Sequence, residues 1–117
     1  MVKPQVSIII LNHNAREFLV RTLDSIAIQQ GIKTEVIVVD NNSTDGSAAM
    51  VKKDYPTVKW VQRDTHIGFS AGNNVGLKHA HANTILFLNP DVTFTTPHDL
   101  SRCWDRLTQD NRLGALT

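Results

Sequence analysis

Acids and amides follow directly after strand-like runs at four places in the chain. The runs are residues 6–11, 35–39, 58–62 and 85–88. The polar residues that come after them include three aspartates and five asparagines: Asn12, Asn14, Asp40, Asn41, Asn42, Asp64, Asn89 and Asp91. Carboxylate and amide oxygens hydrogen-bond to a base or a ribose and bind hard divalent cations. The pattern predicts a polar ligand site if the fold brings these four places together.

The four runs alternate with helical patterns. Residues 6–11 are too apolar to alternate between faces, so we expect a strand that is buried on both sides. Residues 15–27 have one apolar helical face, with Asn14 as the expected N-cap, Glu17 as its capping-box partner and Gly31 closing the helix. A short helix capped by Asp45 ends at Pro56, and a further helix is expected at about 69–82. A last helix is expected to open at Thr96-Pro97-His98-Asp99, with Thr96 as N-cap, Pro97 at N1 and Asp99 at N3.

Strands that alternate with helices predict right-handed βαβ crossovers. The predicted fold class is therefore α/β, with a parallel, Rossmann-like sheet covered by helices on both faces. Such sheets bind ligands at the carboxyl ends of their strands, where the acids and amides above would lie.

The glycines at 68, 72 and 76 are spaced four residues apart and would line one face of a helix, which favours close packing of that helix on the sheet. Neither G-x-x-x-x-G-K-[ST] nor G-x-G-x-x-G occurs, so a P-loop NTPase and a standard dinucleotide-binding protein both lack their motifs. On the last helix Cys103 lies on the apolar stripe and is expected to be a core thiol, and Trp60 and Trp104 are expected to pack in the core.

Net charge, length and the distribution of apolar residues further limit the functional classes that the sequence allows. The 117 residues carry 12 Lys and Arg against 11 Asp and Glu, a net charge of +1 that argues against nucleic acid as a partner. We expect one domain over residues 1–117, and a cytoplasmic protein because the sequence has no signal-peptide pattern and no apolar run of membrane-spanning length. Residues 113–117 resemble the start of a fifth strand, which suggests a piece of a longer protein whose exposed face could promote self-association.

Four motifs, in order, carry a family resemblance. They are residues 6–14 (VSIIILNHN), 38–47 (VVDNNSTDGS), 68–76 (GFSAGNNVG) and 88–92 (LNPDV). Together they resemble the nucleotide-sugar-binding, N-terminal half of the family 2 glycosyltransferases, which are inverting enzymes of GT-A fold, and especially the rhamnosyltransferase-like members. The resemblance covers residues 6–117.

The resemblance implies a role for particular residues. Asn12 and Asn14 match the loop around the nucleoside, and Asp40 matches the aspartate that contacts the base or ribose. Asp91 matches the last acid of the D-x-D motif, which holds Mg²⁺ or Mn²⁺ against the donor diphosphate. The full set implied to contact the donor is Asn12, Asn14, Asp40, Asn42, Asn73, Asn74, Asn89 and Asp91.

The D-x-D position departs from the common pattern, because Asn89 stands where many members have an acid. With one carboxylate, the cation would depend more on the donor phosphates and on water. The N-P-D form is associated with the rhamnosyltransferase-like members, which implies dTDP-rhamnose as a donor beside a UDP-sugar.

The implied reaction is transfer of a sugar from a nucleoside-diphosphate donor to a glycan or lipid-linked acceptor with inversion, as in cell-wall or polysaccharide biosynthesis. The family's catalytic base lies in the second half of the domain, beyond Thr117, so no catalytic residue is assigned and the chain alone is expected to be inactive. The full-length protein could be peripheral at the inner face of the membrane.

Two other classes of function remain compatible with the sequence. A stand-alone, receiver-like regulatory module also has strand-end aspartates, but Asp64 is a poor phosphoacceptor candidate and no lysine follows a fifth strand. A nucleotidyltransferase of similar architecture would need a glycine-rich loop with arginine after the first strand, and that loop is missing.

Overall fold

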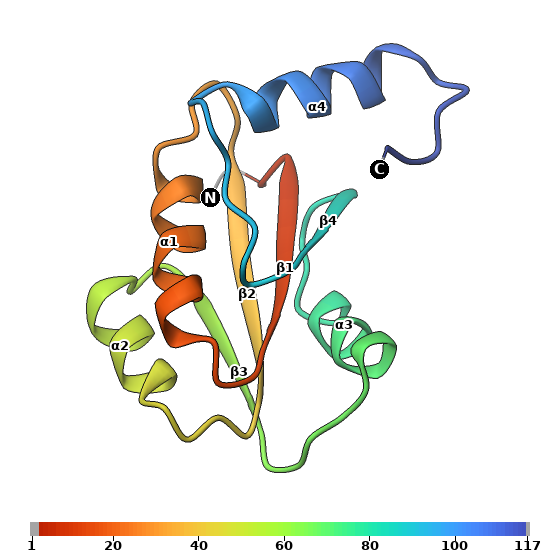
Figure 1. Ribbon diagram of the computed structural model, residues 1–117. Coiled ribbons are helices and arrows are strands. Elements are labelled where there is room, and N and C mark those ends of the chain that lie inside the picture. Colours follow the sequence, from red (N-terminus) through yellow and green to blue (C-terminus); the bar gives the residue numbers. More distant parts are fainter. Residues whose placement is uncertain (1–2, 117) are drawn as a thin grey trace.

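Strands and helices alternate strictly along the part of the chain that the structure describes, residues 3–116 of a computed structural model (Figure 1). The elements in chain order are β1 (Val6–Asn12), α1 (Arg16–Ala27), β2 (Thr34–Asn41), α2 (Ser47–Asp54), β3 (Lys59–Arg63), α3 (Phe69–Leu77), β4 (Thr84–Leu88) and α4 (Asp99–Gln109). The predicted α/β class is confirmed, and each of the four predicted strands is present. No helix within residues 3–116 combines the length and the apolar character needed to cross a membrane.

All strand pairs are parallel, and the sheet order is β3-β2-β1-β4. β2 and β3 lie on one side of β1, and β4 lies on the other side. The strand order therefore reverses between β1 and β4. In doubly wound sheets the ligand crevice lies at the carboxyl ends of the strands at this point.

Both faces of β1 are buried, as its composition predicts. Val6, Ile8 and Ile10 pack with residues of α1 and α2 in the larger core. Ile9, on the opposite face, packs with Ile37 and Val39 of β2 beneath α3. Because successive side chains of a strand point to opposite faces, one uninterrupted apolar run fills both cores.

The expected close packing of α3 is confirmed at two of the three glycines. A Cβ added to Gly72 would lie 2.5 Å from a Leu11 methyl carbon, and one added to Gly76 would lie 2.5 Å from Ile9 Cγ2. Gly68 is instead the N-cap of α3 and has open space around it. The helix therefore lies as close to β1 as its backbone allows.

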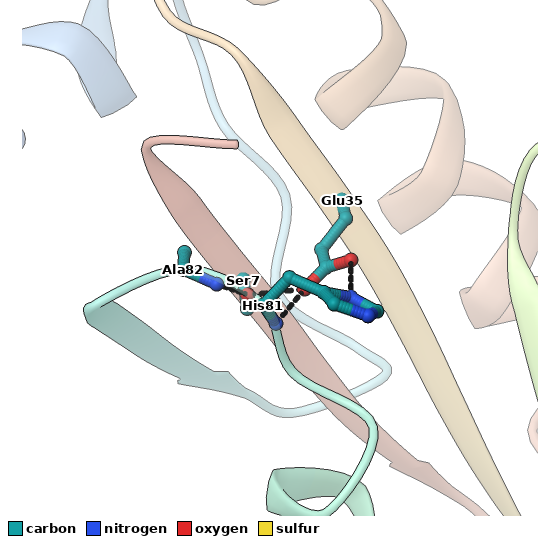
Figure 2. Close-up of polar contacts among 4 residues, drawn as sticks. All are labelled: Ser7, Glu35, His81 and Ala82. Atoms are coloured by element: carbon teal, nitrogen blue, oxygen red, sulfur yellow. Dashed lines mark hydrogen bonds and ion pairs between the residues drawn. The ribbon is translucent and has the colours of Figure 1, made fainter. Parts of the chain in front are cut away.

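α3 ends at Leu77, five residues before the predicted end at residue 82. The backbone N–H groups of His81 and Ala82 are taken by side chains of the neighbouring strands, Glu35 Oε1 on β2 and Ser7 Oγ on β1 (Figure 2). Ser7 Oγ also donates to Glu35, and His81 Nδ1 lies 2.9 Å from Glu35 Oε2. Between the helix and these contacts, the N–H groups of residues 78–80 donate to the carbonyls three residues back. The contacts of Glu35, which we call the Glu35 clasp, then fasten the chain to β1 and β2 just before β4 begins.

The end of the chain differs from expectation in three respects. α4 begins at Asp99 with His98 as N-cap, not at Pro97 with Thr96 as N-cap, because the Asp99 carboxylate accepts hydrogen bonds from Thr96 and holds the preceding residues in a turn. Cys103 is exposed rather than in the core, because within α4 only Leu100 is buried and the rest of the helix lies at the edge of the fold. Residues 113–116 form no strand; the N–H of Leu113 donates to Asp110 O in a turn instead. Trp60 and Trp104 are half-buried and pack against the larger core as predicted.

Candidate functional site

The carboxyl ends of three neighbouring strands lie in register. Asn12 on β1 pairs with Asp40 on β2, and Asp40 pairs with Gln62 on β3. On the other side of β1, Leu88 pairs with Ile10, so β4 ends beside the last residues of β1. The topology thus brings the polar residues that follow β1, β2 and β3 to one edge of the sheet. Residues 89–91 follow β4 at the same edge, on the other side of β1.

Asp40 is the centre of this edge. Its carboxylate is 1% exposed and accepts four hydrogen bonds. Oδ1 accepts from Asn12 Nδ2 at 2.9 Å and from Ser43 Oγ at 2.6 Å, while Oδ2 accepts from Ser43 N at 2.9 Å and from Gln62 Nε2 at 3.0 Å. A buried carboxylate needs such donors to offset its desolvation, and they hold it in one orientation.

The loops after β1 and β2 are joined by hydrogen bonds into one unit. Asn14 N donates to Ser43 Oγ at 2.9 Å, and Thr44 N donates to Asn14 Oδ1 at 2.8 Å. Asn14 and Asn42 both have left-handed backbone conformations, with φ of 49° and 55°. Asparagine tolerates this region better than most residues, which gives both asparagines a local structural role beside the implied contact with a donor.

Asp45 caps two helices. Its Oδ2 accepts from Arg16 N, the first residue of α1, at 3.0 Å, and its Oδ1 accepts from the N–H and hydroxyl of Ser47, the first residue of α2. Gly46 is the N-cap of α2, and Asp45, the residue before it, supplies the side-chain hydrogen bond to the first turn, so the predicted role of Asp45 at this helix start is confirmed in part. The prediction of Asn14 with Glu17 as the capping box of α1 is wrong: Ala15 is the N-cap and makes no side-chain cap, because Asp45 supplies that contact from the other loop.

The charge state of Asp45 follows from these contacts. Partial burial raises the pKa of the carboxyl, but the hydrogen bonds from Ser47 and Arg16 outweigh burial and hold the pKa below its ordinary value. Asp45 thus places a negative charge at the N-termini of α1 and α2, where helix dipoles favour it.

Two buried polar atoms at this edge have no partner among the described residues. They are Oδ1 of Asn12, a fully buried side chain, and Nε of Arg63 at the end of β3. Buried polar groups are nearly always paired in folded proteins, so the unpaired acceptor of Asn12, whose amide nitrogen binds Asp40, marks a place where a ligand or water completes the structure. Arg63 is the register partner of Asn41 and therefore lies on the other face of the sheet from Asp40.

The loop after β3 folds back toward the same edge. Asn41 holds it through hydrogen bonds in both directions with the backbone of Ile67, at 2.7 and 3.3 Å. The ring of His66 lies edge-on to that of His13, with centroids 4.8 Å apart, and His13 Nδ1 donates to Asn41 O at 2.7 Å. Asp64 is exposed on this loop.

The remaining predicted residues lie outside the hydrogen-bonded cluster around Asp40. On α3, Asn73 is buried and Asn74 is exposed. Asn89 and Asp91 are exposed just after β4, where the N–H of Val92 donates to Asn89 O at 3.2 Å and closes a turn. The hydroxyl of Thr22 on α1 donates to Pro90 O at 2.7 Å and anchors that turn.

The oxygen ligands near Asp91 fit a cation that is shared with a phosphate. No group of three or more His, Cys, Asp or Glu within residues 3–116 could hold a metal by itself. Asp91 offers one exposed carboxylate and Asn89 one amide oxygen. Magnesium-type cations commonly take one or two carboxylates and complete their shell with substrate phosphates and water, which suits this set.

Sequence reasoning missed three residues that shape the site. Ser43 and Gln62 bind Asp40, and Thr22 binds the carbonyl of Pro90. Ser43 could have been found from its position three residues after Asp40, a spacing typical of side-chain turns. The role of Gln62 can be deduced only from the strand register, and the role of Thr22 only from the tertiary fold.

The sheet order and the polar strand ends define a Rossmann-like α/β domain whose ligand edge lies at the carboxyl ends of its strands. The chain belongs to glycosyl transferase family 2, whose family model matches residues 7–117. The family and GT-A fold expected from the four motifs are thereby confirmed, and the receiver-like and nucleotidyltransferase alternatives lose their support.

Two relatives illustrate the similarity. The chain is 31% identical over 104 residues to the succinoglycan biosynthesis protein ExoO of Rhizobium meliloti (strain 1021), covering 88% of this chain and 30% of that protein. It is 34% identical over 90 residues to the poly(ribitol-phosphate) beta-N-acetylglucosaminyltransferase TarS of Staphylococcus aureus (strain Mu50 / ATCC 700699), covering 73% of this chain and 16% of TarS.

Solved structures show the same fold. The mannosyltransferase PcManGT from Pyrobaculum calidifontis, in complex with GDP-Man and Mn²⁺, superposes with a TM-score of 0.79 at 25% identity, over 90% of this chain and 33% of that one. Residues 1–349 of S. aureus TarS superpose with a TM-score of 0.76 at 29% identity, over 89% and 33%. The chain thus spans about a third or less of each of these proteins.

Proposed function

We propose that this chain forms the donor-binding part of an inverting glycosyltransferase that transfers a sugar from a nucleoside diphosphate to a glycan or lipid-linked acceptor. The observation that carries the proposal is the Asp40 cluster at the carboxyl ends of β1, β2 and β3, next to the reversal point between β1 and β4, with the unpaired amide oxygen of Asn12 in it. Family membership supports the reaction class. A nucleoside offers the donors and acceptors that such a cluster would recognise.

The proposed division of labour follows the sheet edge. Asn12, Asp40 and the loops joined through Asn14 and Ser43 would surround the nucleoside. Asp91 and Asn89 would hold Mg²⁺ or Mn²⁺ against the diphosphate, and the cation would stabilise the charge that develops on the leaving group. Two similar structures support this arrangement: PcManGT contains GDP-Man and Mn²⁺, and a TarS structure contains UDP-GlcNAc.

Acceptor binding and the catalytic base are assigned to residues outside this chain. Because the chain spans about a third of its relatives, we expect it to bind a donor without transferring the sugar. We expect the whole protein to act in the cytoplasm or at the inner face of the membrane. We expect its products to be polysaccharide or cell-wall precursors, because its relatives include a succinoglycan biosynthesis protein and a teichoic acid poly(glycerol phosphate) polymerase.

Calorimetry with UDP, dTDP and GDP, each with and without Mn²⁺, tests the proposal and identifies the base. One diphosphate should bind more tightly than the other two and more tightly with Mn²⁺, and it should shift the NMR signals of Asn12, Asp40 and Asp91. Preference for dTDP would favour a dTDP-rhamnose donor, and preference for UDP a UDP-sugar. If a folded chain binds none of the three while a longer form of the protein does, donor binding needs the missing part; if neither binds, the proposal is wrong.

A further inference from the structure

Helix α1 carries a stripe of polar side chains within its otherwise apolar inner face. Thr22 and Ser25 are three residues apart on one side of α1, and Gln29 follows four residues after Ser25, just past the end of the helix at Ala27. Thr22 is fully buried and Ser25 is 8% exposed. Polar groups are placed in such positions at a cost unless they are hydrogen-bonded, so their partners indicate what the stripe does.

Each of the three side chains bonds to backbone of the segment between β4 and α4. Thr22 Oγ1 donates to Pro90 O at 2.7 Å, and Phe94 N donates to Ser25 Oγ at 3.1 Å. Gln29 Nε2 donates to Thr96 O at 2.7 Å and its Oε1 accepts from Leu100 N at 3.0 Å. Residues 90–100 are therefore fastened along α1 at three successive levels, and Figure 1 shows this blue segment running beside the helix from the end of β4 to α4.

The Thr22 contact acts on the peptide unit that carries Asp91. The carbonyl of Pro90 belongs to the planar peptide that joins Pro90 to Asp91, so holding its oxygen fixes the plane from which Asp91 projects. The proline ring fixes the backbone on the other side of that carbonyl, and the hydrogen bond from Val92 N to Asn89 O closes the turn around both residues. These contacts hold the backbone of Asp91 in place. Asp91 is exposed, so its carboxylate remains open to solvent.

We propose that Thr22 is a positioning residue for Asp91, holding the Asn89–Val92 turn so that the Asp91 carboxylate meets the cation and diphosphate of the donor. The inference rests on the proposed function, which assigns the cation to Asp91. It explains why a hydroxyl is buried in a helix face that otherwise packs the core. Ser25 and Gln29 hold the same segment farther from Asp91, so their effect on the cation should be smaller.

Thr22→Val tests the proposal, because valine has nearly the same shape and lacks the hydroxyl. Thr22→Ser keeps the hydroxyl and serves as the rescue variant. Thr108→Val is the matched control: the Thr108 hydroxyl also donates to a backbone carbonyl, Trp104 O at 2.8 Å, but on α4.

The first readout needs no ligand and consists of the NMR signals of the Pro90 carbonyl carbon and the Asp91 and Val92 amides, with line broadening of Asp91 by Mn²⁺ alone. The second readout is the gain in affinity that Mn²⁺ gives to the preferred diphosphate.

Thr22→Val should move the Pro90 and Asp91 signals, weaken broadening by Mn²⁺, and reduce the Mn²⁺-dependent gain in affinity by about tenfold, as for other residues that orient a metal ligand. Metal-free affinity should stay unchanged, Thr22→Ser should restore the gain, and Thr108→Val should behave as wild type.

If Thr22→Val does not fold, Thr22→Ala gives the same comparison. Unchanged Asp91 signals, or a preserved Mn²⁺ effect, would overturn the positioning role. Absence of diphosphate binding by the wild type would instead count against the proposed function, while the ligand-free signals still decide whether Thr22 sets Asp91.

Discussion

The side chains of Asn12 and Asp40 meet across neighbouring parallel strands, with Asn12 Nδ2 2.9 Å from Asp40 Oδ1. Both are almost fully buried, and they are register partners at the carboxyl ends of β1 and β2. The contact uses the Asn12 amide nitrogen and leaves its oxygen without a partner among the described residues. The pair therefore joins two strand ends and leaves a buried acceptor without a partner next to Asp40.

Asp40→Ala should weaken binding of the preferred nucleoside diphosphate by tenfold or more, on the order expected when hydrogen bonds to a charged group are lost. It should also lower the free energy of unfolding by about 2–4 kcal/mol, because donors of Asn12, Ser43 and Gln62 lose a buried partner. Calorimetry and urea unfolding measure the two effects. Asp64→Ala, which removes an exposed carboxylate, is the control, and equal affinities of the two variants would count against the site.

Asp45→Ala should destabilise the fold by about 1–2 kcal/mol, because one substitution removes the cap of α1 and the cap of α2. Asp45→Asn should cost less, since the amide keeps one acceptor oxygen. Urea unfolding followed by circular dichroism measures both, with Asp105→Asn on the exposed side of α4 as the control. A loss no larger than that of the control would show that the two caps do not stabilise the helices.

Gly76→Ala should lower the free energy of unfolding by about 1–3 kcal/mol, although alanine is the better helix former. The added Cβ would lie 2.5 Å from Ile9 Cγ2 and 3.3 Å from Val39 Cγ2, so α3 would have to move off the sheet. Gly114→Ala, where no atom lies within 4 Å, should stay within about 0.5 kcal/mol of wild type. Equal stability of the two variants would mean that α3 does not lie this close to β1.

The Glu35 clasp predicts a pH dependence of stability. Partial burial raises the pKa of Glu35, but the hydrogen bond from Ser7 and the contacts of His81 outweigh burial and hold the pKa below its ordinary 4.5. Because the folded pKa is the lower one, the stabilisation is fully present above the unfolded pKa and is lost as the pH falls through the folded pKa.

Glu35→Gln should therefore be less stable than wild type at pH 7, and the difference should shrink as the pH falls from about 5 to 3. Urea unfolding of both proteins across this range isolates Glu35 from the other carboxylates with lowered pKa, Asp45, Asp99 and Asp110. Hydrogen exchange of the His81 and Ala82 amides should speed up over the same range in wild type. A constant difference between the two proteins would contradict the clasp.

The sequence by itself determined the order and type of the elements, because the signals for these are local. The apolar run of residues 6–11 required burial on both faces, and the glycines at 72 and 76 required a close approach between α3 and the sheet. Asp45 was identifiable as a residue that bonds the start of α2 because it is an acid in the polar turn directly before that helix. The acids and amides at the strand ends followed from the parallel topology, which places those ends at one edge.

The tertiary structure alone decided which side chains meet. Asp45, and not Asn14, supplies the side-chain cap of α1 from 29 residues away, and Thr22 reaches Pro90 across 68 residues. α3 ends at Leu77, and after it Glu35 and Ser7 take the backbone donors of His81 and Ala82. Each of these outcomes is a competition between a local partner and a distant one for the same hydrogen-bonding group. Periodicity and spacing describe only the local partner, so the distant one could be known only once the strands and helices were packed together.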